Sequence, residues 1–286
     1  MTARPATPKP KRLKPAKPIT ARKLAKAAWR ELKTGFKRYA LIIGVVAVPQ
    51  NLISLSASLA GNSTVTIVVN LAILTMNVVL IWAMVEREKT GVIPGPLTAY
   101  YDGSITLVRS VVVYAILLVM LIPLAIASSV YVLLLMGAEY GITTAAEEVL
   151  IGSICLLISL ISFWLLARYL LAVIGVIADN LRPIAAVRFA RQLTLGRFWR
   201  VVGRLAMLVL MLAVISIPIS GVTALLTALK LPTLGAIVFK LVTSMVALPF
   251  AYAYLLALYR DLSASALVAP NPHDVAAEAV PAEAAA

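Results

Sequence analysis

The sequence predicts an all-α polytopic membrane protein, and three observations lead to that prediction. The 286 residues are 62% hydrophobic and 13% charged, with a mean hydropathy of +0.97, whereas soluble domains are about 45 to 50% apolar and about 25% charged. Several apolar runs each contain the roughly 20 residues that a helix needs to cross a bilayer. The chain also carries 26 Lys and Arg against 12 Asp and Glu. These values exclude a soluble globular protein.

Six apolar segments meet the length criterion for transmembrane helices. They are residues 39–59, 64–85, 111–136, 149–178, 205–229 and 234–258. The third and fourth segments are longer than a bilayer requires, so we expect tilt there, or helices that continue past the interface.

Apart from Lys230 in the last turn, the basic residues outside the spans fall on one side of these six spans. They precede residue 39 and occupy the connections 86–110 and 179–204, whereas the connection 137–148 holds three glutamates and no basic residue. Because lysine and arginine are enriched in cytoplasmic loops, we expect both termini in the cytoplasm. The net charge of +14 is then explained by the basic residues that mark the cytoplasmic side of the spans. Nucleic acid is therefore not an expected partner.

The segments that flank the spans are polar. Residues 1–18 interleave proline with Lys and Arg and predict a disordered basic arm, and residues 263–286 predict a disordered, acidic, alanine-rich tail. We expect the arm to help determine the membrane topology and to be loosely attracted to anionic lipid headgroups. Binding of RNA, a ribosome or an acidic protein is the alternative.

Residues 20–38 predict an amphipathic helix in the cytoplasmic interface, with Leu24, Ala28 and Leu32 in the acyl boundary. A short amphipathic stretch from Pro183 is expected before the fifth span. Lipid headgroups are the expected partners of the basic and aromatic residues of these segments. These residues are Lys23, Lys26, Arg30, Lys33, Lys37, Arg38, Arg197, Trp199 and Arg200.

Four spans contain a proline, and we expect a helix kink at each one. The prolines are Pro49, Pro123, Pro218 and Pro249. In the three odd-numbered spans a hydroxyl residue follows five positions later, at Ser54, Ser128 and Thr223. Hydroxyls or neighbouring helices can satisfy the carbonyl that proline frees. This pattern favours three tandem helical-hairpin units with cytoplasmic interfacial segments; the alternative is that proline is simply common in membrane helices.

Polar groups inside spans are candidate functional sites. The first candidate is an intramembrane polar patch formed by Gln50, Asn51, Asn70 and Asn77. We expect these residues to form interhelical hydrogen bonds; the alternative is that they line a substrate site. The second candidate is a cytoplasmic vestibule formed by Arg168, Asp179, Arg188 and Arg191. We expect Arg168 to snorkel to the interface; the alternative is that it organises this vestibule and pairs with Asp179.

The sequence carries no motif of soluble-enzyme chemistry. Its single histidine, His273, lies in the predicted tail, and no P-loop, GxGxxG, GxSxG or CxxC pattern occurs. We therefore expect no enzymatic activity, no cofactor and no metal site.

The connection after the fourth span carries a resemblance to a known family. The stretch from Asp179 to Trp199, with Arg168 before it, resembles the cytoplasmic signature of a group of bacterial six-helix membrane proteins. That group includes the membrane domain that precedes the catalytic domain of some glycerophosphodiester phosphodiesterases. The matching positions are Asp179, Pro183, Ala186, Arg188, Leu193, Gly196, Phe198 and Trp199. Ala190 stands where the group usually has a serine.

The terminal Tyr259-Arg260-Asp261 is also similar to the group, and the likeness covers roughly residues 20–262. The phosphodiesterase catalytic domain is missing, so that activity does not carry over. The resemblance implies the six-helix architecture, the bacterial cytoplasmic membrane, and a role in membrane or envelope physiology.

Three functions are compatible with these observations. We expect a non-catalytic scaffold or accessory subunit that contacts anionic lipid and binds a membrane protein partner or a second copy of the chain. The alternative is a lipid or small-solute transporter, since kinked repeats occur in many transporters. A membrane-embedded lipid enzyme ranks last, because its only candidate groups are Arg168 and Asp179.

Overall fold

The computed structural model describes residues 20–55, 63–139, 145–230 and 232–267, and every regular element in these ranges is a helix. The all-α prediction is therefore confirmed for the described residues. The predicted arm at residues 1–18 lies outside them. In chain order the elements are α1 (Ala21–Leu55), α3 (Ser63–Thr90), α4 (Pro96–Gly103), the 3-10 helix η1 (Ser104–Thr106), α5 (Leu107–Glu139), α6 (Ala145–Tyr169), α7 (Leu171–Ala178), α8 (Pro183–Thr194), α9 (Phe198–Ala228) and α10 (Pro232–Leu267).

Five described segments are long and apolar enough to cross a membrane. They are Thr64–Thr90, Pro96–Leu133, Val149–Ala178, Phe198–Leu226 and Gly235–Ser265. These segments overlap five of the six predicted spans and indicate a membrane-embedded protein. The remaining predicted span, residues 39–59, is not among them, and its residues 56–59 lie outside the described part of the chain.

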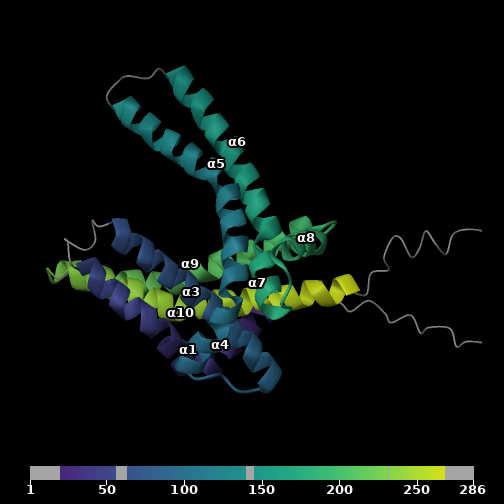
Figure 1. Cartoon of the computed structure of the whole chain (residues 1–286). Helices are drawn as coiled ribbons and strands as arrows, with labels where there is room; N and C mark the ends of the chain where they lie inside the picture. Colours follow the sequence, from purple (N-terminus) through teal and green to yellow (C-terminus); the bar gives the residue numbers. More distant parts are fainter. Residues whose placement is uncertain (1–19, 56–62, 140–144, 231, 268–286) are drawn as a thin grey trace, which may run out of the picture.

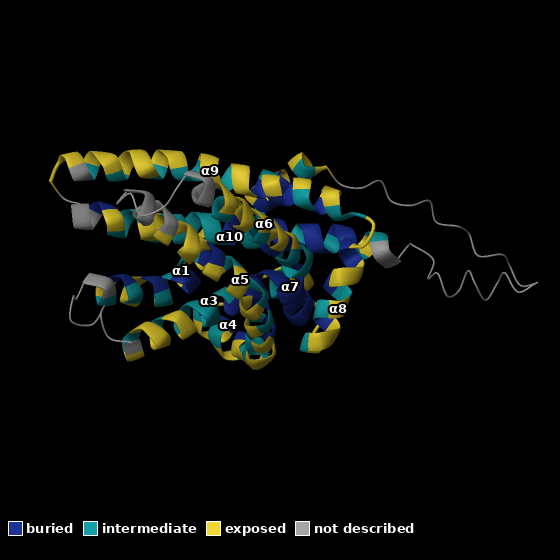
Figure 2. Ribbon diagram, turned by 90° about the horizontal axis from the view of Figure 1, so that it is seen from above, coloured by how far each residue is buried: buried dark blue, intermediate teal, exposed yellow. Residues whose placement is uncertain are grey.

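Four long helices lie side by side in a layer, in the order α9, α10, α1, α3 (Figures 1 and 2). Successive neighbours in this layer run in opposite directions, so α1 begins at the same end at which α10 finishes. The α5–α6 hairpin leaves this layer at a steep angle in Figure 1. The layer therefore joins the first and last hairpins of the chain, and the middle hairpin stands apart from it.

Helix α1 corrects the prediction of an interfacial helix at 20–38 followed by a separate span. The chain is one continuous helix from Ala21 to Leu55. Its apolar stripe, Leu24, Ala28 and Leu32, is buried, and α1 packs more extensively on α10 than on α3. The Trp29 and Phe250 rings meet edge-on, 6.2 Å apart, across this contact. The stripe therefore packs against protein. This is possible because α10 continues beyond its own apolar segment and so lies beside the first half of α1.

The fourth predicted span is divided into two helices. α6 ends at Tyr169, and α7 begins at Leu171. All eight residues of α7 are buried, and the helix contacts α3, α5, α6, α8 and α10. Figure 2 shows α7 in the colour of buried residues throughout, whereas the half of α9 farthest from α8 is mostly exposed. α7 is therefore the centre of the packed end of the molecule.

A short helix precedes each of the second and third hairpins. α4 begins at Pro96 and α8 begins at Pro183, each with proline in the first turn, a position where its missing N–H costs no hydrogen bond. α8 ends before Gly196, whose φ of +70° is the left-handed conformation that glycine adopts without strain. Its buried face is formed by Ala186, Ala190 and Leu193.

Each of the four predicted kink prolines lies inside a helix that continues past it: Pro49 in α1, Pro123 in α5, Pro218 in α9 and Pro249 in α10. The hydroxyls of Ser128 and Thr223 donate to the carbonyls of Ala125 and Ile219, in the turn preceding each hydroxyl. These two bonds do not reach the carbonyl four residues before the proline. Ser54 lies outside the residues whose side chains are described.

α10 also continues farther than predicted. It reaches Leu267, so residues 263–267, assigned to the tail, are helical. Residues 268–286 lie outside the described part of the chain.

Candidate functional site

Charged side chains gather at one end of the molecule, where α1 begins, α3 and α10 finish, and α7 and α8 lie. We call this the charged end. Apart from Lys230 and Lys240, every described lysine and arginine lies in the first half of α1, in α8, near an end of another long helix, or in a connection on this side. Three polar clusters built from carboxylates, arginines and tyrosines tie the helices together here.

The first cluster surrounds Asp179, the residue that follows α7. The Tyr259 hydroxyl donates a hydrogen bond to Oδ2 of Asp179, and Nη1 of Arg260 lies 3.1 Å from Oδ1. Nε of Arg260 also contacts Oε2 of Glu88 at 3.2 Å. Two carboxylates and one guanidinium therefore join α7, α10 and α3.

Local sequence explains how Tyr259 reaches Asp179. Gly175 of α7 faces the tyrosine, and a Cβ atom there would lie 3.3 Å from the Tyr259 oxygen. The Phe189 ring of α8 meets the Tyr259 ring edge-on at 6.2 Å. A small residue on one side and an aromatic residue on the other thus hold the tyrosine in place.

The second cluster joins α1 to the end of α3. Nη1 of Arg87 and the Tyr39 hydroxyl each lie 2.5 Å from Oε1 of Glu31. Nη2 of Arg87 donates to the Thr34 hydroxyl at 2.6 Å. Because Arg87 is followed directly by Glu88, adjacent residues of α3 contact α1 and α10, respectively.

The third cluster is buried between α9 and α10. Nη1 of Arg204 lies 2.6 Å from Oδ2 of Asp261, and their side chains are only 6% and 7% exposed. The Tyr254 hydroxyl donates to the Arg204 carbonyl at 2.9 Å. This ion pair couples the start of α9 to the end of α10.

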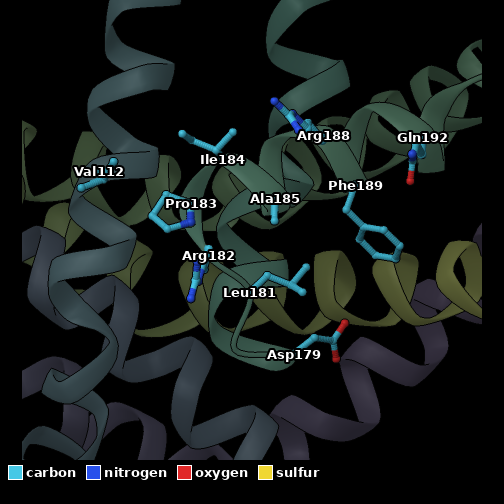
Figure 3. Close-up of a pocket in the computed structure, with 10 residues that line it drawn as sticks. All are labelled: Val112, Asp179, Leu181, Arg182, Pro183, Ile184, Ala185, Arg188, Phe189 and Gln192. Carbon is cyan, nitrogen blue, oxygen red and sulfur yellow. The ribbon is translucent and has the colours of Figure 1, made fainter.

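A cavity of about 790 Å³ lies beside α8 (Figure 3). Asp179, Arg182, Arg188 and Gln192 supply its polar groups, and the remaining wall is largely apolar. Figure 3 shows Asp179 and Arg188 at opposite sides of the labelled group. The cavity therefore contains an acid and two arginines without gathering them at a single point.

The predicted vestibule is only partly assembled. Asp179 and Arg188 line the same cavity, whereas Arg191 is exposed and is not among the lining residues. The alternative pairing of Arg168 with Asp179 is not formed: the Arg168 guanidinium lies 5.0 Å from the centre of the Trp164 ring. Asp179 is instead occupied by Tyr259 and Arg260, because the end of α10 reaches α7.

The four residues of the predicted intramembrane patch occupy different environments. Nδ2 of Asn51 donates to the Ala47 carbonyl of its own helix at 2.7 Å, and Gln50 lines a cavity of about 150 Å³ between α1 and α3. Asn70 is exposed. Oδ1 of Asn77 is buried and has no hydrogen-bond partner among the described residues.

Most of the predicted headgroup residues are exposed, although lipid contact itself stays a prediction. Lys23, Lys26, Arg30, Lys33, Lys37, Arg38, Trp199 and Arg200 are exposed, and the Trp199 side chain is 82% exposed. Arg197 is half-buried and donates to the Ser265 carbonyl at 3.3 Å. Within the described residues, no group of three or more His, Cys, Asp or Glu is placed to hold a metal ion.

Sequence reasoning missed Glu31, Arg87 and Glu88 as cluster members and treated Tyr259 and Arg260 only as part of a resemblance. The available signal was the position of these residues, at helix ends where apolar runs stop. The chain matches no protein-family model, no curated protein and no solved structure. The two segments that carry the resemblance nevertheless contact each other, since Asp179 bonds both Tyr259 and Arg260.

Proposed function

We propose that this chain is a multi-pass protein of the bacterial cytoplasmic membrane, with six spans in three helical hairpins and both termini in the cytoplasm. Its proposed role is that of a non-catalytic scaffold or accessory subunit whose charged end binds anionic lipid headgroups. A membrane protein partner or a second copy of the chain would then assemble on its apolar faces.

The charge distribution carries this proposal. At the charged end, the carboxylates of Glu31, Glu88, Asp179 and Asp261 each face an arginine. The exposed cations of α1 thus face outward while these acids are already engaged. Such a surface attracts anionic lipid with about 1 kcal/mol for each basic residue near the membrane. An excess of basic residues on one side is also the pattern of a cytoplasmic face.

The apolar surface supports the membrane part of the proposal. Large hydrophobic side chains are exposed along α5, α6 and α9, including Leu118, Leu157 and Ile217. Contiguous apolar surface of this extent is covered by lipid or by another protein.

The six-span arrangement further requires the α5–α6 hairpin to share the direction of the four-helix layer. In the structure the hairpin contacts two helices of the layer, α3 and α9, and also the short helices α7 and α8.

Lipid retention tests the proposed function. The full chain is purified in a mild non-ionic detergent and equilibrated with phosphatidylglycerol or phosphatidylcholine, and native mass spectrometry measures the lipid that stays bound. The test variant changes Lys23, Lys26, Arg30 and Lys33 to Gln. The control changes two lysines to Gln, Lys230 and Lys240, which lie away from the charged end.

We expect the native chain to retain phosphatidylglycerol in preference to phosphatidylcholine. The test variant should lose phosphatidylglycerol affinity at least about tenfold, because four attractions of about 1 kcal/mol are removed. The control should retain it. Equal retention of both lipids by the native chain, or equal loss in both variants, would contradict the proposal.

A further inference from the structure

A second cavity at the charged end, of about 400 Å³, lies between α1 and the connection that follows α3. Three cations line it: Lys37 and Arg38 from α1 and Arg87 from α3. The Thr34 hydroxyl adds a polar neutral group, and the described lining contains no carboxylate. Its walls therefore offer hydrogen-bond donors and positive charge together.

Both arginines are held in place by protein contacts. Arg87 reaches the Glu31 carboxylate and the Thr34 hydroxyl through its two terminal nitrogens, at 2.5 Å and 2.6 Å. Arg38 donates through Nη1 to the Ile93 carbonyl. A guanidinium carries five N–H donors, so each arginine keeps donors for a ligand. Fixed donors lower the ordering cost of binding.

Two glycines shape the cavity wall. A Cβ atom on Gly35 would lie 2.4 Å from Cε2 of Tyr39 and 2.7 Å from Cδ1 of Ile93, so a larger residue would displace the wall. Gly91 ends α3 with a φ of +75°, and its N–H donates to the Arg87 carbonyl at 2.8 Å. The chain thereby turns back over the cavity, at the point where Arg87 enters it.

The sequence places this cavity where a phosphate is available. Lys37 and Arg38 directly precede Tyr39, the first residue of the first predicted span, so the proposed topology puts them at the depth of the lipid headgroups. Arginine forms paired hydrogen bonds with phosphate oxygens, and lysine binds them as a point charge. Arg87 already neutralises Glu31, which leaves Lys37 and Arg38 as the uncompensated charges of the lining.

We propose that this cavity is a phosphate-binding site that takes a single phosphate group, either on an anionic lipid headgroup or free. The lipid form of this inference rests on the proposed function, because it needs the charged end at the membrane surface. Lys37 and Arg38 supply the charge, and the remaining N–H donors of Arg87 supply further hydrogen bonds, whereas the Thr34 hydroxyl already donates to the Arg30 and Glu31 carbonyls.

The test uses the full chain in a non-ionic detergent and isothermal titration calorimetry. The probes are dioctanoyl phosphatidylglycerol and, separately, inorganic phosphate. The test variants are Lys37→Gln and Arg38→Gln. The controls are Arg22→Gln and Lys89→Gln, which remove exposed cations of the same two helices that do not line the cavity. Lys37→Gln keeps the test valid if Arg38→Gln disturbs the contact with Ile93.

We expect each test variant to weaken binding about tenfold or more, the usual effect of losing a hydrogen bond to a charged group, and each control to stay within about twofold. Binding of both probes with the same sensitivity identifies the phosphate alone as the ligand. Binding of the lipid only identifies the headgroup. Equal losses in test and control variants, or no binding of either probe, would overturn the site.

The two proposals fail in different ways. If the change of Lys23, Lys26, Arg30 and Lys33 abolishes lipid retention while Lys37→Gln and Arg38→Gln behave as the controls do, only the cavity proposal fails. If the native chain shows no preference for phosphatidylglycerol in the retention experiment but binds inorganic phosphate through Lys37 and Arg38, only the proposed function fails.

Discussion

Tyr259 links α10 to α7 through its single hydroxyl group, which donates to Asp179 while the ring packs against Phe189. Tyr259→Phe keeps the ring and removes the donor, so we expect a loss of about 1 to 2 kcal/mol of stability. Thermal unfolding in detergent, followed by tryptophan fluorescence, measures it. Tyr101→Phe is the control, because that side chain is 79% exposed. Equal unfolding midpoints for the two variants would show that the Asp179 contact contributes nothing.

The ion pairs of the charged end differ in burial, and their substitutions should differ accordingly. Asp261→Asn leaves Arg204 with its charge in a pair that is nearly closed to solvent, and such a change costs about 3 to 5 kcal/mol. Glu88→Gln disrupts a contact whose side chains are 38% and 43% exposed, and exposed pairs contribute about 0 to 1 kcal/mol. In the same unfolding assay, Asp261→Asn should lower the unfolding midpoint far more than Glu88→Gln does. The reverse ranking would refute this assignment.

Single residues of the candidate site could be predicted from the sequence, but their hydrogen-bond and ion-pair partners could not. Asp179 stood out because it ends a long apolar run, and the structure places it both in a polar cluster and in a cavity. Its partners come from α10, 80 or 81 residues away along the chain. No local pattern encodes such a pairing, since it depends on how α10 packs on α7. The same reason explains why the alternative pairing with Arg168 is not formed.

Helix α1 is the element whose packing the sequence described least well. Its apolar stripe was correctly located, but a stripe beside cations fits a membrane interface and a protein groove equally well. The length of α10 decides between them, because its end supplies the surface that buries Leu24, Ala28 and Leu32. The break at Leu170 could not be predicted either, because residues 153–174 contain neither glycine nor proline.

Two glycines of α1 give a direct test of its packing. Gly35→Ala places a methyl group 2.4 Å from a ring atom of Tyr39, which is completely buried and cannot easily move. We expect this variant to unfold at a lower temperature. Gly44→Ala places its methyl group 3.7 Å from Met245 and should be neutral or stabilising by up to about 1 kcal/mol, the helix preference of Ala over Gly. A tolerated Gly35→Ala would contradict the α1 packing described above.

At the scale of the whole molecule, hydropathy and charge predicted most of the architecture. Apolar runs located the long helices, and the concentration of lysine and arginine on one side predicted the charged end. The arrangement of the hairpins was beyond that information, because any apolar helix face can pack on any other. The structure pairs α1 with α10 and sends α5 and α6 out of the layer (Figure 1).

The middle hairpin provides its own test of the six-span proposal. Cys155→Ala first removes the only native thiol, and Glu147→Cys then places one thiol near the start of α6, at the hairpin tip. If the hairpin crosses the membrane, a membrane-impermeant maleimide should label this cysteine in intact cells. Labelling only after the cells are opened would mean that the hairpin tip stays on the cytoplasmic side.

The central claim is that the charged end faces the cytoplasm, and cysteine labelling at two exposed positions tests it most directly. Arg191→Cys marks α8 at the charged end, and Lys230→Cys marks the opposite end, between α9 and α10. In the Cys155→Ala background, we predict that an impermeant maleimide labels position 230 in intact cells and position 191 only after the membrane is opened. Labelling of position 191 in intact cells, with protection of position 230, would contradict the claim.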